Sequence, residues 1–377
     1  EPVFVCIGRW VECLPAFFGA AASGNFYVPI DPALPDRRLA EIYATMKPRV
    51  VVTTRRDTRP LPFPGAEILS LEELLLTPPD EPLLRRIGAE ITGEYPLYCI
   101  FTSGSTGVPK AVVVSHRSTI DFIDAFTGLF GFSHQDVLGN QAPFDFDVSV
   151  KDLYTGLATG ATVYLIARKY FSMPARLLDL LCRQGVTSLT WAVSALCLVT
   201  AMNGLNYKTP DRVRQVLFSG EVMPPKHLRA WRKALPNARF VNLYGPTEGT
   251  GMCCYYRVER EFAEDEAIPI GRPFPNREIL LLTPEGKRAE TGQEGEICIR
   301  GTALTLGYYN DPERTAEAFV QNPLNTAYPE RIYRTGDIGR YNEAGELLFV
   351  SRKDYQIKHM GHRIELGEIE VNVDMLP

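Results

Sequence analysis

The sequence has no cysteine pattern of the kind that builds a disulfide framework or a zinc site. It contains eight cysteines in 377 residues, none spaced as CxxC, and most lie in apolar stretches. Such cysteines are typical of free core thiols in a reducing compartment. We therefore predict no cysteine-based metal site, and a cytoplasmic location. The cysteines are Cys6, Cys13, Cys99, Cys182, Cys197, Cys253, Cys254 and Cys298.

Long apolar runs and a strong charge of one sign are also missing. No stretch is long enough to cross a bilayer, and the first residues lack the charged-then-apolar pattern of a signal peptide. The 40 basic and 45 acidic side chains leave a formal net charge of −5. That balance argues against binding to nucleic acid or to a membrane surface, so we expect neither as a partner.

Hydrophobic residues, by contrast, make up 45% of the chain, which is enough for a large core divided among two or three units. Short β-branched runs alternate with amphipathic stretches. This alternation is typical of parallel sheets covered by helices, an α/β layered fold. The expected strands are 49–53, 110–114, 161–166, 214–218 and 239–243, and the expected helices are 37–46, 175–184 and 225–235.

The pattern changes near residue 271. Apolar segments at 279–282, 296–300 and 346–350 are separated by turns rich in Gly, Pro and Glu, which indicates a small antiparallel or β-barrel-like subdomain. A buried strand that starts at residue 3 and a new unit that begins near residue 365 suggest that both ends are cut from a larger fold. The predicted parts are α/β subdomains over 1–270, a β-rich subdomain over 271–352, and a hinge with the beginning of a further domain over 353–377.

Residues 102–110, TSGSTGVPK, follow one apolar strand and precede another. Glycines and small hydroxylated residues let backbone N–H groups turn toward an anion, and Lys110 supplies a positive charge suited to phosphate. The segment is not a Walker A loop, because no Lys-Ser/Thr follows its glycines and no helix is expected after it. On its own it is equally compatible with a polar hairpin turn.

Two later strands end in glycine-containing turns that carry a carboxylate. Residues 244–248 read YGPTE and residues 333–337 read YRTGD. Open α/β sheets bind ligands at such strand ends. One carboxylate suits Mg²⁺ beside a triphosphate, and the other suits ribose hydroxyls. Either side chain is also compatible with a helix cap.

These motifs together resemble the adenylate-forming superfamily, which includes acyl-CoA synthetases, luciferases and the adenylation domains of non-ribosomal peptide synthetases. The resemblance covers nearly the whole chain, with the motifs in the family's order. Ala111 departs from the pattern, because the family usually has Gly after its Pro-Lys. The matching segments are 24–32 (GNFYVPIDP), 102–110, 146–149 (FDVS), 244–248, 301–309 (GTALTLGYY), 333–337, 351–356 (SRKDYQ) and 361–370 (GHRIELGEIE).

The resemblance implies an ATP- and Mg²⁺-dependent reaction in which a substrate carboxylate attacks the α-phosphate, giving an acyl-AMP and pyrophosphate. It implies the large N-terminal core of the family's fold, with substrate and ATP bound by residues 1–270. The small C-terminal domain, which carries a lysine that contacts the reacting groups, would be absent. Asp354 matches the hinge of that domain, and the chain alone is therefore expected to bind ATP but to adenylate poorly.

The resemblance also assigns the nucleotide-site residues, of which Lys110, Thr247, Glu248 and Arg352 are expected to act in catalysis. They are Thr102, Ser103, Ser105, Thr106 and Lys110 around the β- and γ-phosphates, Thr247 at the α-phosphate, Glu248 on Mg²⁺, Tyr244, Asn242, Ser219, Gly220 and Glu221 at adenine, Asp337 on the ribose, and Arg352 at ribose or phosphate.

Asp147 indicates an amino acid as the substrate. In members of the family that activate α-amino acids, an Asp at this position pairs with the substrate ammonium, whereas fatty-acid and aryl-acid activators generally lack it. Such a charge-assisted contact is worth about 1.5–3 kcal/mol. The alternative is a cap for a helix over 150–157. The implied pocket lining is Val148, Lys151, Thr190, Leu217, Ser219, Leu243, Gly251 and Met252, of which Val148, Leu217, Ser219 and Leu243 resemble serine-activating domains.

Lys151 stands where the family more often has an aromatic or apolar residue. A buried, unpaired ammonium is costly. Lys151 should therefore pair with Asp147 or Asp152, or reach water, or meet a carboxylate or other acceptor on the substrate. We predict a small polar amino acid as the substrate, with an acidic amino acid as the competitor.

Other interpretations remain open. Segments 146–157 and 216–224 are also similar to D-alanine:carrier-protein ligases, which use the same chemistry. Asp147 opposes an acyl- or aryl-CoA synthetase. Intact Lys110, Glu248, Asp337 and Arg352 oppose a non-catalytic nucleotide-binding module. The resemblance further implies a phosphopantetheine-bearing carrier protein as the partner, in non-ribosomal peptide synthesis.

Overall fold

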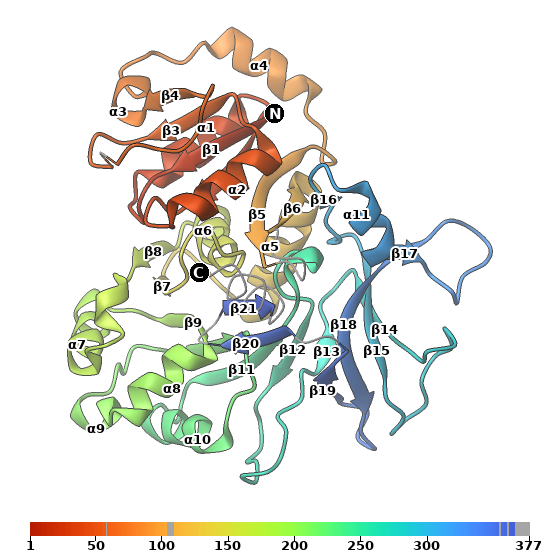
Figure 1. Ribbon diagram of the computed structural model, residues 1–377. Helices are drawn as coiled ribbons and strands as arrows, with labels where there is room; N and C mark the ends of the chain where they lie inside the picture. The colour runs from red at the N-terminus through yellow and green to blue at the C-terminus, as the bar shows by residue number, and fades with distance from the viewer. Residues whose placement is uncertain (58, 104–108, 354–355, 360–361, 366–377) are drawn as a thin grey trace, which may run out of the picture.

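The described part of the chain forms three large β-sheets flanked by helices, together with a two-stranded hairpin (Figure 1). The structure is a computed structural model that describes residues 1–57, 59–103, 109–353, 356–359 and 362–365. The α/β layered class predicted from the sequence is confirmed, together with a separate antiparallel sheet near the end of the chain.

The first sheet has seven strands in the order β16-β6-β5-β2-β1-β3-β4. Its middle is parallel, whereas β6 and β16 join at one edge in antiparallel fashion. Near it in sequence lie helices α1 (Cys13–Ala22), α2 (Asp36–Met46), α3 (Leu71–Leu74) and α4 (Glu81–Glu90). The strands are β1 (Pro2–Cys6), β2 (Phe26–Ile30), β3 (Val50–Thr53), β4 (Glu67–Ser70), β5 (Pro96–Thr102), β6 (Lys110–Ser115) and β16 (Gly307–Tyr308).

The second sheet also has seven strands, in the order β13-β12-β11-β10-β9-β7-β8, and is parallel from β8 to β11. Its strands are β7 (Val137–Asn140), β8 (Thr162–Leu165), β9 (Ser188–Ala192), β10 (Gln215–Ser219), β11 (Arg239–Tyr244), β12 (Cys254–Arg257) and β13 (Arg272–Pro273). The accompanying helices are α5 (His116–Phe130), α6 (Val148–Thr159), η1 (Arg168–Tyr170), α7 (Pro174–Gln184), α8 (Val193–Ala201), α9 (Gly204–Tyr207), α10 (Pro225–Ala234) and η2 (Thr247–Gly249).

The third sheet, at the right of Figure 1, is antiparallel throughout. Two short strands within the predicted β-rich range belong elsewhere, since β13 extends the second sheet and β16 extends the first. The third sheet comprises β14 (Arg277–Leu282), β15 (Gly295–Gly301), β17 (Phe319–Gln321), β18 (Arg331–Tyr341) and β19 (Leu347–Arg352), with α11 (Pro312–Ala318) beside it; β20 (Gln356–His359) and β21 (His362–Glu365) form a separate hairpin.

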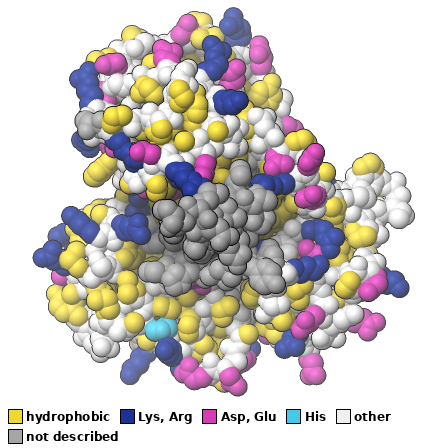
Figure 2. All heavy atoms as spheres, in the orientation of Figure 1, with side chains coloured by type: hydrophobic (Ala, Val, Ile, Leu, Met, Phe, Trp, Pro, Cys, Tyr) yellow, Lys and Arg dark blue, Asp and Glu magenta, His cyan; other side chains and the backbone are white. Residues whose placement is uncertain are grey.

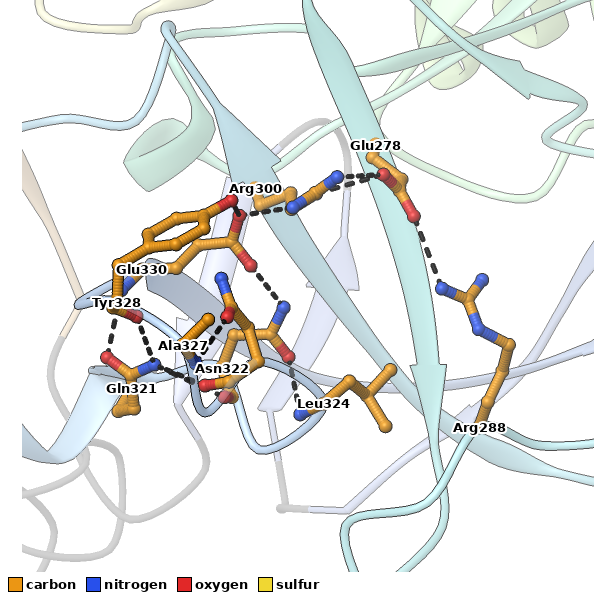
Figure 3. A network of polar contacts seen from close by, with 10 residues as sticks. Glu278, Arg288, Arg300, Gln321, Asn322, Leu324, Ala327, Tyr328 and Glu330 are labelled. Carbon is orange, nitrogen blue, oxygen red and sulfur yellow. Dashed lines mark hydrogen bonds and ion pairs between the residues drawn. The ribbon is translucent and has the colours of Figure 1, made fainter.

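A polar network crosses the third sheet (Figure 3). The Arg300 guanidinium joins Glu278 on β14, at 2.6 Å, to Glu330 before β18, and Arg288 reaches Glu278 at 3.4 Å. Arg288, Glu278 and Arg300 are partly solvent-accessible, so the ion pairs among them contribute little stability individually. Over the face shown in Figure 2, Lys and Arg side chains are interspersed with Asp and Glu.

Helix α6 links the two large sheets. Its Val150 and Leu153 pack in the apolar cluster beneath the first sheet. Its Val148 packs beside the cluster that α5 forms against the second sheet, and its Tyr154 packs beside both clusters. The start of α6 is therefore held by both sheets, where their strand ends approach each other. No helix in the described part of the chain is both long and apolar enough to span a membrane.

Candidate active site

A cavity of about 2270 Å³ lies where strand ends of the first and second sheets meet. Its walls come from β5, from the segment before α6, from the turns after β10 and β11, and from the third sheet. Binding at the carboxyl ends of strands is the rule for open α/β sheets. The predicted site residues on its wall are Thr102, Ser103, Asp147, Val148, Ser219, Gly220, Thr247, Met252, Asp337 and Arg352.

The predicted phosphate loop connects β5 to β6. Thr102 and Lys110 face each other across this antiparallel pair, and β6 follows where a Walker A loop would begin a helix. The Thr102 side chain is 9% exposed, and its hydroxyl has no hydrogen-bond partner among the described residues. A buried hydroxyl without a partner is unfavourable unless a ligand satisfies it. Ser105 and Thr106 lie outside the described residues.

The turn after β11 is tightly folded. A Cβ atom placed on Gly245 would lie 2.1 Å from the Gly251 carbonyl oxygen, so only glycine fits. Thr250 and Gly251 both have positive φ angles, of 55° and 74°. Within this turn Thr247 lines the cavity, whereas Glu248 is fully buried behind it.

The Glu248 carboxylate accepts a hydrogen bond from the Tyr308 hydroxyl at 2.8 Å. The short helix η2 that carries Glu248 packs against β6, the strand that begins with Lys110. In the described part of the chain no three His, Cys, Asp or Glu side chains are grouped to hold an ion. Mg²⁺ is often bound by one or two carboxylates together with substrate phosphates. A single buried carboxylate beside the phosphate-loop strand fits that mode.

Asp337 is the centre of a second polar cluster. Its carboxylate accepts hydrogen bonds from the Tyr244 hydroxyl at 2.5 Å and from the Arg352 guanidinium at 2.6 Å. The β18–β19 register places Asp337 directly opposite Arg352. Burial and the nearby Asp337 charge raise the pKa of Tyr244 well above its ordinary value, so the phenol stays protonated as the donor. The cluster fixes the carboxylate that the sequence assigned to ribose.

Two of the residues predicted at adenine bond to the protein backbone. The Glu221 carboxylate accepts from the Ser194 N–H at 3.0 Å, in the first turn of α8. The buried Asn242 side chain donates to the Pro269 carbonyl at 2.9 Å. Ser219 and Gly220 lie on the cavity wall, and Tyr244 is 6% exposed behind it.

Asp147 occupies the N-cap position of α6 but makes no side-chain capping bond. Asp147 and Thr247 both line the cavity, and the Thr247 hydroxyl lies near enough to the Asp147 carboxylate to lower its pKa. Burial raises the pKa of Asp147, and the Glu248 charge adds to this, whereas the Thr247 hydroxyl and the Lys151 charge oppose it. The helix-cap alternative is therefore not realised. The structure brings together the residues assigned to substrate and to α-phosphate.

The other residues predicted to line the substrate pocket lie behind the cavity wall. Thr190, Leu217 and Leu243 are at most 3% exposed, and Gly251 packs against the Phe122 ring. Only Val148, Ser219 and Met252 of the implied lining reach the cavity.

Lys151 is 1% exposed, and its ammonium donates to the Val148 carbonyl at 2.5 Å. Burial lowers the pKa of Lys151, and the charges of Asp152 and Asp147 partly oppose this. No carboxylate of a described residue forms a direct ion pair with it, and the Asp152 carboxylate accepts a hydrogen bond from the Asn140 side chain at 2.9 Å. Of the alternatives left open for Lys151, the intramolecular ion pair is not formed, and a contact with a backbone carbonyl is made instead.

Several charged residues on the cavity wall were not assigned to the site from the sequence, and Arg9 and Asp145 are two of them. Arg9 donates to the carbonyls of Ile166 and Asn140, at 2.6 and 2.8 Å, and so ties the end of β1 to the second sheet. Asp145 has its pKa raised to about 6 by burial and by the Asp31 charge. Neither belongs to a recognisable motif, and Arg9 and Asn140 are 131 positions apart.

Comparison with known proteins agrees with this arrangement. Residues 1–309 match the family described as AMP-binding enzyme. The chain is 32% identical over 367 residues to bacitracin synthase 1 of Bacillus licheniformis, covering 97% of this chain and 7% of that protein. It is 30% identical over 383 residues to the D-alanine--D-alanyl carrier protein ligase of Lacticaseibacillus casei (strain BL23), covering 100% of this chain and 73% of the ligase.

Among solved structures, holo-PA1221, an NRPS protein containing adenylation and PCP domains bound to a vinylsulfonamide inhibitor, superposes with a TM-score of 0.84 at 27% identity, covering 100% of this chain and 64% of that one. The chain also covers 5% of tyrocidine synthase 3 of Brevibacillus parabrevis, at 33% identity over 96% of this chain. It therefore spans a small part of the large synthases it matches and most of the ligase.

Proposed function

We propose a function from the family to which the chain belongs, the AMP-binding enzymes. In this proposal the protein activates the carboxylate of an amino acid as an aminoacyl-AMP. The observation that carries the proposal is the placement of Asp147 and Thr247 together on the wall of one cavity. It joins a carboxylate suited to a substrate ammonium to a hydroxyl suited to the α-phosphate. An ammonium held by Asp147 would leave the adjacent carboxylate close to the phosphorus that it attacks.

The chemistry is an in-line displacement. A carboxylate oxygen forms the new bond to the α-phosphorus, the bond to the bridging oxygen breaks, and pyrophosphate leaves with the electron pair. Thr102, Ser103 and Lys110 would hold the leaving phosphates, with Ser105 and Thr106 completing the loop. Bound Mg²⁺ would neutralise phosphate charge there, and Glu248 is the side chain to hold it.

The remaining groups orient the nucleotide. Asp337 would accept hydrogen bonds from the ribose hydroxyls, since Tyr244 and Arg352 already fix its carboxylate. Arg352 also places a positive charge on the cavity wall. No side chain serves as a covalent nucleophile, so positioning and charge neutralisation account for catalysis.

A small polar amino acid fits the pocket best. Val148, Ser219 and Met252 form a partly apolar wall with one hydroxyl, and Lys151 is turned to the Val148 carbonyl rather than to the cavity. The second candidate is an acidic amino acid. The Asp152 and Asp147 charges partly offset the buried Lys151 charge, and a substrate ammonium at Asp147 would weaken the share that Asp147 supplies. A side-chain carboxylate would restore it.

The acyl group would then pass to the phosphopantetheine thiol of a carrier protein. The similarity to a D-alanyl carrier protein ligase and to a structure with adenylation and PCP domains supports this partner. A module of a cytoplasmic peptide synthetase and a free-standing D-alanine ligase both use this step. The proposed hinge residue, Asp354, lies outside the described residues.

Non-reactive analogues of aminoacyl-AMP, the aminoacyl-sulfamoyl-adenosines, test the proposal without turnover. Thermal unfolding with a panel of them should show the largest stabilisation with a small polar or an acidic aminoacyl group, exceeding that of sulfamoyl-adenosine alone. Equal stabilisation by sulfamoyl-adenosine and every aminoacyl analogue would indicate a nucleotide-binding module and contradict the proposal. Strongest stabilisation by a large aromatic analogue would contradict the substrate assignment alone.

A further inference from the structure

Tyr308 lies in the predicted β-rich part of the sequence, but its side chain contacts the turn after β11. Its side chain is 9% exposed, and its hydroxyl donates to the fully buried Glu248 carboxylate at 2.8 Å. A second link runs beside it, because the Thr305 N–H donates to the Glu248 carbonyl at 3.0 Å. Glu248 is therefore held through both its backbone and its carboxylate by residues 305–308.

The backbone of Tyr308 is fixed to the phosphate-loop strand. In the β16–β6 pair Tyr308 stands opposite Val112, two residues after Lys110. The flanking Leu306 and Tyr309 N–H groups donate to the Val113 and Ala111 carbonyls, at 2.9 and 2.8 Å.

The position is constrained from the other side as well. The Tyr308 N–H donates to the Thr315 hydroxyl at 3.0 Å, and its ring packs edge-on against Phe319, with centroids 6.1 Å apart. Gly307 has a φ of 119°, and a Cβ there would lie 2.5 Å from the Thr315 methyl. The ring and its hydroxyl thus have little freedom.

We propose that Tyr308 is a positioning residue, which fixes the Glu248 carboxylate relative to Lys110 and so sets the metal ligand beside the phosphate loop. The proposal rests on the role given to Glu248 in the proposed function. Glu248 belongs to the second sheet's turn and Lys110 to the first sheet, and β16 bridges the two. Partners that orient a metal ligand typically change metal affinity about 10- to 100-fold when removed.

The test compares Mn²⁺ binding to the protein–ATP complex, measured from the electron paramagnetic resonance of free Mn²⁺, with metal-free ATP binding by calorimetry. Tyr308→Phe should weaken Mn²⁺ binding about 10-fold or more and change metal-free ATP affinity less than about twofold. Glu248→Gln serves as the reference for loss of the ligand. Tyr27→Phe is the matched control, since it removes another buried hydroxyl, paired with Tyr154 at 3.0 Å.

Normal Mn²⁺ affinity in Tyr308→Phe, with loss in Glu248→Gln, would overturn the positioning role and leave the metal assignment intact. Normal affinity in Glu248→Gln would overturn the metal assignment of the proposed function and with it the role of Tyr308. If Tyr308→Phe weakens metal-dependent and metal-free binding equally, or if Tyr27→Phe gives the same loss, the effect is structural and the proposal fails.

Discussion

Asp147 carries the substrate assignment at the scale of single residues. Replacing it with alanine should weaken amino-acid binding about 10- to 100-fold, because the lost charge-assisted contact is worth about 1.5–3 kcal/mol. The variant should also lose its preference for an amino acid over the same acid without the amino group. Competition of both ligands against a labelled acyl-AMP analogue measures this ratio. An unchanged preference in Asp147→Ala would place the ammonium elsewhere.

Asp145 makes the stability depend on pH. Burial and the Asp31 charge raise its pKa from 3.8 to about 6. The folded state therefore binds the Asp145 proton more tightly than the unfolded state does. This tighter proton binding stabilises the folded state at low pH, and the stabilisation is lost as the pH rises from about 4 through about 6.

Asp145→Asn should consequently raise the unfolding temperature near pH 7.5 by about 2–4 °C, allowing for the part of the carboxyl that faces the cavity, and by much less at pH 4. Thermal unfolding of both proteins at the two pH values checks this. The same shift at both values would show that the ionised carboxylate costs nothing in the folded state.

Which residues could be predicted depends on how local their signal is. Thr102, Lys110, Asp147 and Asp337 stand in motifs that can be recognised from a few neighbours. The partner of Lys151 could not be predicted, since either adjacent acid was as good a choice as the substrate. The Tyr308–Glu248 contact joins positions 60 apart and exists only once two sheets have been assembled.

At the scale of elements, the turn from β11 to β12 is set by backbone fit. Gly245→Ala should displace Thr247 and Glu248, because the new Cβ would meet the Gly251 carbonyl 2.1 Å away. We expect it to lose most of the stabilisation by Mg·ATP, which is about 2.7 kcal/mol at 100 times the dissociation constant. Gly128→Ala in α5, where the added Cβ meets nothing within 4 Å, is the control and should keep it. Retained stabilisation in Gly245→Ala would mean that this turn does not shape the site.

Adjacent strands of the third sheet carry two arginines that differ in burial and in their expected contribution to the free energy of unfolding. The Arg277 side chain is 1% exposed and pairs with Asp121 on α5, whereas Arg300 is 35% exposed in the network of Figure 3. Arg277→Ala should lower the free energy of unfolding by about 3 kcal/mol, because the largely buried Asp121 carboxylate loses its cationic partner and keeps the Asn276 and Thr302 donors. Arg300→Ala should cost less than about 1 kcal/mol.

Urea denaturation of the two variants measures both costs in one protein. Similar losses would contradict the view that α5 is anchored to the third sheet by a buried ion pair.

Strand and helix predictions succeeded where the apolar pattern was long enough. The strand predicted at 239–243 is β11 (Arg239–Tyr244), and the helix predicted at 225–235 is α10 (Pro225–Ala234). The two-residue strands β13 and β16 have no such pattern, since they are defined only by the neighbours that they pair with. This is why they join other sheets than their place in the sequence indicated.

At the scale of the whole molecule, the cavity exists because three sheets contribute to one place. The first sheet supplies Thr102, the second supplies the turn with Thr247, and the third supplies Asp337 and Arg352. Helix α6 shares its packing between the first two and presents Asp147 at their junction. The family resemblance had already assigned these residues to one nucleotide site, whereas the contacts that hold them there became apparent only in the folded structure.

Amino-acid-dependent exchange of labelled pyrophosphate into ATP, measured with the full-length natural protein, tests the central claim most directly. Exchange should require Mg²⁺ and an amino acid, be greatest with a small polar or an acidic one, and fall about 10-fold or more in Asp147→Ala. A protein that binds ATP but shows no exchange with any amino acid, or equal exchange with the deaminated acids, would contradict the account.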